Sequence, residues 1–175
     1  MANTCRTVSE RATQTLHIAE QNSLSLLSIA LDYHTLGCAD LYVALLDEGA
    51  LPACHVSTQH AVDGLRRAGT QDHLIPGLLT RAWLYMLENN PDGAQADLDE
   101  AWEIAERGPM PLYQADIYLH RARLFFCEAT YPWRNEDSSP RSAKSDLAEA
   151  RRLIEKHGYW RRKEELEDAE AIIGR

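Results

Sequence analysis

Apolar residues recur along the chain at the spacing of one helical face. Three segments share the pattern Leu-x-x-Ala followed by an aromatic residue three positions later, and they span residues 26–33, 78–85 and 118–125. Because positions i, i+3 and i+6 or i+7 lie on one side of an α-helix, each segment lines a contact stripe with a large, a small and an aromatic side chain. The small alanine allows a second helix to approach closely.

A second pattern, Ala-x-x-Asp-Leu-x-Glu-Ala, occurs twice, over residues 94–101 and 143–150. Each copy continues into a charged last turn and then reaches a glycine, which favours a helix C-terminus. Residues 60–69 carry a weaker copy, and a similar apolar stripe near the start of the chain indicates a further helix. These segments are expected to be the second helices of helical hairpins, the first of them without a partner.

The order of the two patterns predicts an all-α chain with three antiparallel hairpins and a C-terminal capping helix. Residues 90–93 (Asn-Pro-Asp-Gly) predict a tight turn within the middle hairpin, and residues 108–111 separate it from the third. A capping helix covers the apolar end of such a stack. In a single domain of residues 1–175, the expected boundaries are about 5–21 for the first helix, 24–69, 73–108 and 111–158 for the hairpins, and 159–173 for the cap.

Two connections are expected to be longer than the tight turn of the middle hairpin. They cover residues 38–54 and 130–142, although residues 40–46 are apolar and are able to extend the preceding helix past Gly37. Residues 131–140 form the clear long loop, because they are rich in helix breakers while holding two aromatic residues.

The repeated segments resemble the tetratricopeptide repeat family, in which a small residue of the first helix packs against an Ala-x-x-x-aromatic-or-Leu-x-x-Ala pattern in the second. The resemblance covers most of residues 5–158. It implies a right-handed stack of hairpins, an α-solenoid, with a partner protein or peptide held in the concave groove that the first helices line. The matching positions are Ala94, Leu98 and Ala101, then Ala143, Leu147 and Ala150, and Ala82 with Tyr85 or Met86.

Residues 78–82, 96–108 and 158–166 resemble more particularly the C-terminal repeat arms of bacterial signalling ATPases of the NACHT-like class. This resemblance implies a sensor or scaffold part of a larger system, with any nucleotide-binding part outside the chain. No Gly-x-x-x-x-Gly-Lys-Ser/Thr phosphate loop and no Gly-x-Ser-x-Gly nucleophile elbow occur. We therefore expect no enzymatic activity and no cofactor.

Composition narrows the class of partner. The 175 residues include 27 acidic and 18 basic side chains, a formal net charge of -9, without a cluster of positive charge. Neither nucleic acid nor an anionic membrane surface is therefore expected as a partner. No apolar run approaches the roughly 18 residues of a membrane span, and no hydrophobic signal segment follows Met1. The expected location is the cytoplasm.

Candidate reactive side chains are scattered along the chain. His55 and His60 are the nearest histidine pair but share a helical face only in part, and no close second cysteine complements Cys54, so no metal site is expected. The cysteines are expected to be reduced and mostly buried; they are Cys5, Cys38, Cys54 and Cys127. The acids of one helix are expected to form a solvated outer face; they are Asp97, Asp99, Glu100, Glu103 and Glu106.

Arginines and aromatic residues are the candidates for partner binding. Arg81 and Arg121 precede the repeat alanines in two first helices, where they either offer forked donors to a carboxylate of the partner or pair with a neighbouring acid. Trp133 is either an exposed contact residue of the long loop or folds back on the third hairpin. Trp83 and Trp102 are expected to seal helix packing. The expected partner-binding set is Arg81, Arg121, Tyr85, Tyr118 and Trp133.

Three functions remain open on the sequence alone. The first is a scaffold or sensor module that binds a partner protein or peptide. The second is a small helical enzyme or ligand-binding domain with a pocket between hairpins. The third is a self-associating scaffold, because a first helix without a partner would expose apolar surface to a second copy.

Overall fold

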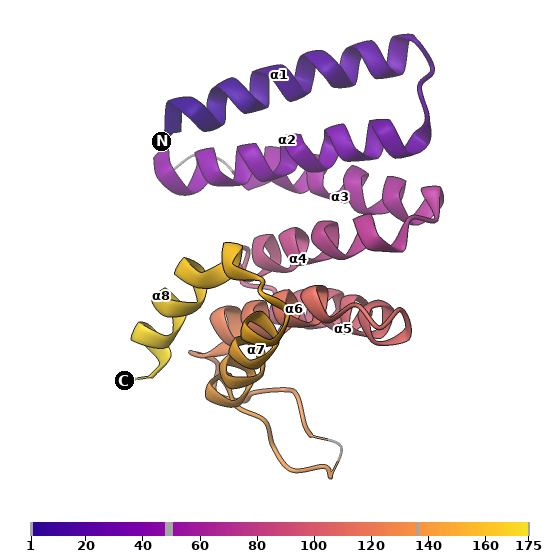
Figure 1. Cartoon of the computed structure of the whole chain (residues 1–175). Coiled ribbons are helices and arrows are strands. Elements are labelled where there is room, and N and C mark those ends of the chain that lie inside the picture. The colour runs from indigo at the N-terminus through magenta and orange to yellow at the C-terminus, as the bar shows by residue number, and fades with distance from the viewer. Residues whose placement is uncertain (1, 48–50, 136, 175) are drawn as a thin grey trace. The chain divides into compact units, whose positions relative to one another are not determined.

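The computed structural model describes residues 2–47, 51–135 and 137–174 of the chain (Figure 1). Within these residues the fold is all-α, with eight α-helices, one short 3-10 helix and no strand beyond an isolated bridge. The all-α class of the expected fold is thereby confirmed. The elements are α1 (Ala2–Gln21), α2 (Leu26–Asp47), α3 (Leu51–Ala68), α4 (Gln71–Leu87), α5 (Pro91–Arg107), α6 (Pro111–Phe125), α7 (Ala143–His157), η1 (Trp160–Arg162) and α8 (Lys163–Ile173).

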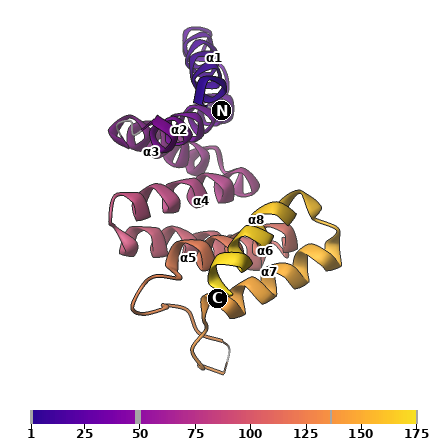
Figure 2. The same cartoon turned by 90° about the vertical axis from the view of Figure 1, so that its left-hand side faces the viewer.

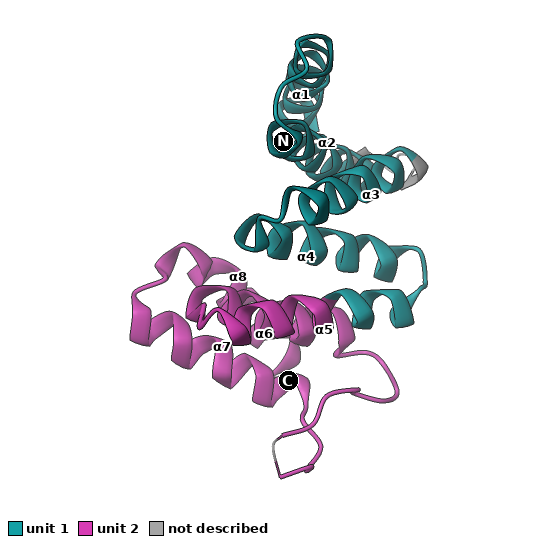
Figure 3. Ribbon diagram, turned by 90° about the vertical axis from the view of Figure 1, so that its right-hand side faces the viewer, with its two compact units in different colours: residues 1–97 teal, residues 98–175 magenta. Residues whose placement is uncertain are grey.

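The chain divides into two compact units, Met1–Asp97 and Leu98–Arg175, and each is described by itself (Figure 3). The boundary falls inside α5, so the first unit holds α1 to α4 with the start of α5. The second unit holds the rest of α5 together with α6, α7, η1 and α8.

The first helix has a partner, which corrects the sequence expectation. α1 runs antiparallel to α2 and packs against it (Figure 1). Its buried residues are Ala12, Leu16 and Ala19, the stripe of a helix that faces a neighbour. Because α1 is covered by α2, the observation that suggested self-association through a lone first helix is removed.

Helix α2 is the apolar centre of the first unit. It packs against α1 and α3, and it continues unbroken through Gly37 to Asp47. The extension over residues 40–46 is therefore confirmed, and the long connection expected over 38–54 is wrong. Contrary to the sequence expectation, residues Leu26–Leu46 are long and apolar enough to cross a membrane. A helix packed between two neighbours meets the same criteria in a protein core.

The contact between α2 and α3 depends on two glycines. A Cβ atom on Gly64 of α3 would lie 2.7 Å from the Cβ of Ala30, and one on Gly37 of α2 would lie 2.8 Å from Thr58 Oγ1. Both distances are shorter than a Cβ atom keeps from a carbon or oxygen atom to which it is not bonded. The two helices therefore approach to a separation that only the missing side chains allow.

The repeat alanines lie where the pattern predicts. Ala30, Ala82 and Ala122 are each exposed by 1% or less. In the first unit, side chains from α2, α3 and α4 form a small apolar cluster, against which Trp83 packs. The cluster contains Leu41, Ala44, Cys54 and Leu84.

The turn before α5 differs in detail from the expectation. The helix begins at Pro91, inside the segment expected to form the turn, and Asn90 precedes it. The Oδ1 atom of Asn90 accepts a hydrogen bond from the backbone N–H of Gly93 at 3.0 Å. An asparagine before a first-turn proline is a favourable helix start, since its side chain satisfies a free N–H group.

In the second unit, α7 packs against α6 and α8 (Figure 2). Ser142 starts α7 with a capping box to Ser145, and the helix ends at Gly158 as expected. Leu166 and Ala169 of α8 join the apolar cluster of α6 and α7, so a helix over Lys163–Ile173 packs on this unit as the apolar stripe predicts. The cluster contains Ala115, Leu119, Ala122, Ala143, Leu147, Ala150, Leu153, Ile154, Leu166 and Ala169.

The connection between α6 and α7 is the long loop that the sequence predicts. Its described residues extend away from the helices as the orange segment in Figures 1 and 2, closed by a bridge between Arg134 and Pro140.

The four cysteines differ in burial. Cys127 lies exposed at the start of the loop between α6 and α7, Cys5 and Cys38 are half-buried, and Cys54 alone of the four is fully buried. All four are free thiols, but the expectation that most are buried is wrong.

The close α2–α3 approach predicts a specific mutational coupling. Gly64→Ala should destabilise the folded state by about 1–3 kcal/mol, because the new methyl group overlaps Ala30. Removing the opposing methyl group with Ala30→Gly should make the double variant more stable than the sum of the two single effects. Chemical unfolding of the four proteins measures this coupling, and strict additivity would contradict the packing.

Candidate functional site

Arg81 is buried in an ion pair rather than free to meet a partner. It donates from Nε to Asp97 Oδ2 at 2.8 Å and from Nη2 to Asp97 Oδ1 at 2.7 Å, and Nη1 donates to Gln59 Oε1 at 3.0 Å. Arg81 is 6% exposed and Asp97 is 4% exposed. The alternative in which Arg81 pairs with a neighbouring acid is confirmed. Asp97 does not belong to a solvated outer face, which corrects that expectation for this residue.

Arg121 and Trp133 belong to one buried cluster of the second unit. The Arg121 guanidinium lies over the rings of Trp102, at 4.9 Å, and Trp133, at 4.5 Å, and it donates to Asp99 Oδ1 at 3.3 Å. Trp133 Nε1 donates to the same Asp99 oxygen at 2.6 Å, and the indole packs edge-on against Phe125. The loop tryptophan therefore folds back on the third hairpin, and the exposed alternative is wrong.

Tyr85 and Tyr118 are half-buried beside these groups. The Tyr85 ring lies 5.6 Å from the Arg81 guanidinium, and the Tyr118 ring lies 4.9 Å from both Trp102 and the Arg141 guanidinium. Arg81 and Tyr85 belong to Met1–Asp97, whereas Tyr118, Arg121 and Trp133 belong to Leu98–Arg175. Within the first unit Arg81 contacts Tyr85, and within the second Arg121 contacts Trp133. Binding of a partner by these residues stays a prediction.

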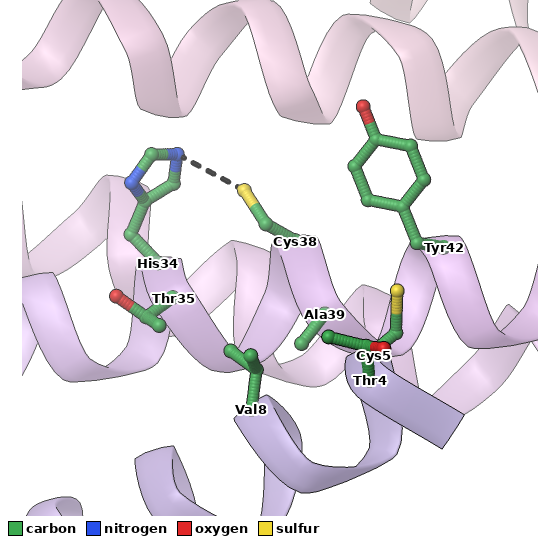
Figure 4. A pocket seen from close by; sticks show the side chains of 8 residues that line it. All are labelled: Thr4, Cys5, Val8, His34, Thr35, Cys38, Ala39 and Tyr42. Atoms are coloured by element: carbon green, nitrogen blue, oxygen red, sulfur yellow. Dashed lines mark hydrogen bonds between the residues drawn. The ribbon is translucent and has the colours of Figure 1, made fainter. Parts of the chain in front are cut away.

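A pocket of about 360 Å³ opens between α1 and α2 (Figure 4). Its α2 wall presents His34, Cys38 and Tyr42, whose spacing of four residues places them along one face of the helix. Tyr42 is 48% exposed and packs edge-on against Trp83 of α4 at 5.5 Å between ring centroids. The lining residues are Thr4, Cys5, Val8, His34, Thr35, Cys38, Ala39 and Tyr42.

A polar group lies in the wall of this otherwise apolar pocket. His34 Nε2 is 3.5 Å from Cys38 Sγ and 3.3 Å from Thr80 Oγ1, and Thr80 Oγ1 is 3.5 Å from the sulfur (Figure 4 draws the His34–Cys38 contact). The Thr80 hydroxyl also reaches the Pro76 carbonyl oxygen at 3.0 Å. Since a hydroxyl has one proton, Thr80 donates either to Pro76 or to the sulfur at a given moment.

The contact between His34 and Cys38 shifts the pKa values of both groups in opposite directions. Burial on its own raises the pKa of the Cys38 thiol, but hydrogen bonds and charge interaction with His34, helped by Thr80, bring that pKa below its usual value. Burial likewise lowers the pKa of His34, but the interaction with Cys38 and a bond to the Pro76 carbonyl raise it overall. A thiolate beside an imidazolium is the form that these shifts favour, and thiolate is the nucleophilic form of cysteine.

Cys54 is the contrasting thiol of the first unit. Burial, with the nearby charges of Asp40 and Glu88, raises its pKa to about 11, so it remains protonated.

His55 and His60, the nearest histidine pair in the sequence, do not face each other. His55 faces Glu88 at 3.1 Å, while His60 packs edge-on against Tyr33. Among the residues that the structure describes, no three His, Cys, Asp or Glu side chains are placed to hold a metal ion.

Sequence reasoning missed the His34–Cys38 pair, although a signal was present. His-x-x-x-Cys places an imidazole and a thiol one turn apart on a helix. The sequence predicted that this helix ends near Cys38, so the two side chains were not expected to lie one helical turn apart. Thr80 lies 42 residues beyond Cys38 and reaches it through the packing of α4 near α2, which no local pattern indicates.

The buried Arg81–Asp97 pair predicts a large stability effect. Arg81→Met should cost about 3–5 kcal/mol, because Asp97 is left buried without its cation. The double variant Arg81→Met/Asp97→Leu should recover most of this loss. As a matched control, Arg66→Met removes a half-exposed pair with Asp63 and should cost less than about 1 kcal/mol. Equal unfolding free energies for Arg81→Met and Arg66→Met would contradict the assignment.

No family model, curated protein or solved structure matches the chain. The resemblance to tetratricopeptide repeats thus stands on the repeated segments themselves.

Proposed function

We propose that the chain is a protein-interaction module of the tetratricopeptide type, a scaffold or sensor that binds a partner protein or peptide. In this proposal the chain forms a right-handed stack of hairpins, and the first helix of each hairpin lines the groove. The module performs no catalytic step. In a NACHT-like signalling system of a bacterial cytoplasm, it would be the part that receives the signal.

The observation that supports this function best is the apolar pocket beside the aromatic pair of Tyr42 on α2 and Trp83 on α4. Tyr42 is half-exposed at the rim and rests on Trp83, while Val8 and Ala39 line the interior. Binding energy at protein interfaces concentrates where an apolar side chain of one partner fills a pocket bordered by aromatic residues of the other. A protruding apolar residue of the partner is the proposed anchor.

The chemistry of the partner follows from the charges that remain available. Arg81 and Arg121 are engaged with Asp97 and Asp99, so recruiting them to a partner's carboxylate would require breaking buried or half-buried ion pairs. The chain carries a net charge of -9. An apolar anchor flanked by neutral or basic residues is therefore favoured over an acidic segment, since opposite charge accelerates association.

A small-molecule ligand is the second candidate for the same pocket. Its volume of about 360 Å³ lies within the range of ligand sites, roughly 300–1,000 Å³. An apolar lining with few polar side chains is also typical of such sites, and here those side chains include His34, Cys38 and Thr35. A compact apolar ligand would occupy the position proposed for the partner's side chain.

Selection from a random peptide library against the folded chain tests the partner-binding proposal. The selected peptides should share a large apolar residue at one position. Tyr42→Ala should weaken their binding about tenfold, or 1.4 kcal/mol, because it removes the rim of the pocket. Isothermal titration with the best peptide measures the loss.

The matched control is Val56→Ala, which shortens a residue on α3 that is 55% exposed and lies outside the pocket lining. This variant should bind the peptide as the unaltered chain does. If Tyr42→Ala and Val56→Ala bind equally well, the peptide does not use the pocket. Failure of any peptide to bind, together with saturable uptake of small apolar compounds, would favour the second candidate.

A further inference from the structure

We propose that Cys38 is a covalent modification site, a nucleophilic thiol that adds to an apolar α,β-unsaturated carbonyl compound held in the pocket between α1 and α2. The reaction uses only residues of this chain, and the compound competes with a partner's side chain for the same pocket. It assigns a chemical role to the His34–Cys38–Thr80 group, which partner binding leaves unexplained.

The geometry brings a thiol, a proton donor and an apolar cavity to one place. Cys38 is one of the residues that line the pocket, and it is half-buried. His34 Nε2 lies 3.5 Å from that sulfur and also lines the pocket. Thr80 approaches from α4 at the same distance and offers a hydroxyl donor. The lowered pKa of Cys38 and the raised pKa of His34 agree with an ion pair.

The addition requires no group that the pair does not supply. The Cys38 thiolate attacks the β-carbon, an S–C bond forms, and the electron pair of the C=C bond moves onto the carbonyl oxygen as an enolate. The enolate returns to a carbonyl when its α-carbon takes a proton, which the His34 imidazolium supplies as it becomes neutral. A thiol and an enal thus give one saturated thioether, without leaving group, oxidant or reductant.

The lining selects the class of electrophile. Val8, Ala39 and the ring of Tyr42 offer apolar surface, which favours an alkyl-chain compound over a charged or strongly hydrated one. Cys5 lines the same pocket from α1 and is the competing nucleophile. Cys127, exposed on the α6–α7 loop, reports the reactivity of a thiol in open solvent.

The probe is trans-2-nonenal, an enal with a six-carbon tail, added in limiting amount to the full reduced chain at neutral pH. Mass spectrometry of the digested protein then gives the rate of adduct formation at each cysteine. Cys38 should react at least about tenfold faster than Cys127 although it is less exposed. In urea the two rates should become equal. An adduct that forms on Cys127 or Cys5 as fast as on Cys38 in the folded chain would overturn the proposal.

Two variants separate activation by His34 from a structural role. His34→Gln should slow the Cys38 reaction about tenfold, reduce the ultraviolet absorbance of the thiolate and leave the Cys127 rate unchanged. Val8→Trp should slow the reaction of Cys38 with nonenal by filling the cavity, yet leave its reaction with the small reagent iodoacetamide nearly unaltered. Circular dichroism checks that both variants fold. An unchanged Cys38 rate in folded His34→Gln would refute the role of the pair, and an unchanged nonenal rate in Val8→Trp would refute the pocket.

Discussion

The close approach of α2 to α3 is the constraint on which the first unit depends. At Gly37 and Gly64 the facing helix occupies the space where a side chain would begin, with Thr58 and Ala30 as the opposing residues. This contact fixes α2 against α3, and α1 also packs against α2. The stripe of His34, Cys38 and Tyr42 is thereby held along the wall of a pocket. One helix thus combines the packing centre of the unit with its most distinctive surface.

Ion pairs within the chain engage Arg81 and Arg121, the two arginines that the sequence offered as candidates for partner binding. Arg81 and Asp97 satisfy each other through two parallel hydrogen bonds, and in the second unit Arg121 lies between two indole rings while Asp99 accepts from Arg121 and Trp133. Removing Arg81 is costly because Asp97 then stays buried and charged without its partner. These cations contribute to the fit between successive helices. The groups that remain for recognition are the apolar surface of the pocket and the Cys38 thiol among its lining residues.

The repeated patterns predicted the helices well, because helical periodicity is a local property. Ala30, Ala82 and Ala122 are buried as their spacing indicated, and the cap at Lys163–Ile173 packs as an apolar stripe should. The partner of the first helix could not be read in this way, since pairing of α1 with α2 is a tertiary contact. A glycine often ends a helix, so a helix end near Gly37 was a reasonable local expectation. In the fold, however, Gly37 lies within a continuous helix, because Thr58 of α3 occupies the space of a side chain at this position. Because the helix was expected to end near Cys38, the contact between His34 and Cys38 one turn apart was not predicted. Thr80 comes close to Cys38 only through tertiary packing.

These features lead to one account, in which the pocket between α1 and α2 is the place where the chain meets its ligand or partner. Nuclear magnetic resonance of the methyl-labelled chain during titration with a selected peptide tests this claim most directly. The account predicts that resonances of Val8 and Ala39, which line the pocket, shift together and saturate at the peptide's dissociation constant, while Val56 on α3 remains still. Saturable shifts at Val56, with Val8 and Ala39 unmoved, would contradict it.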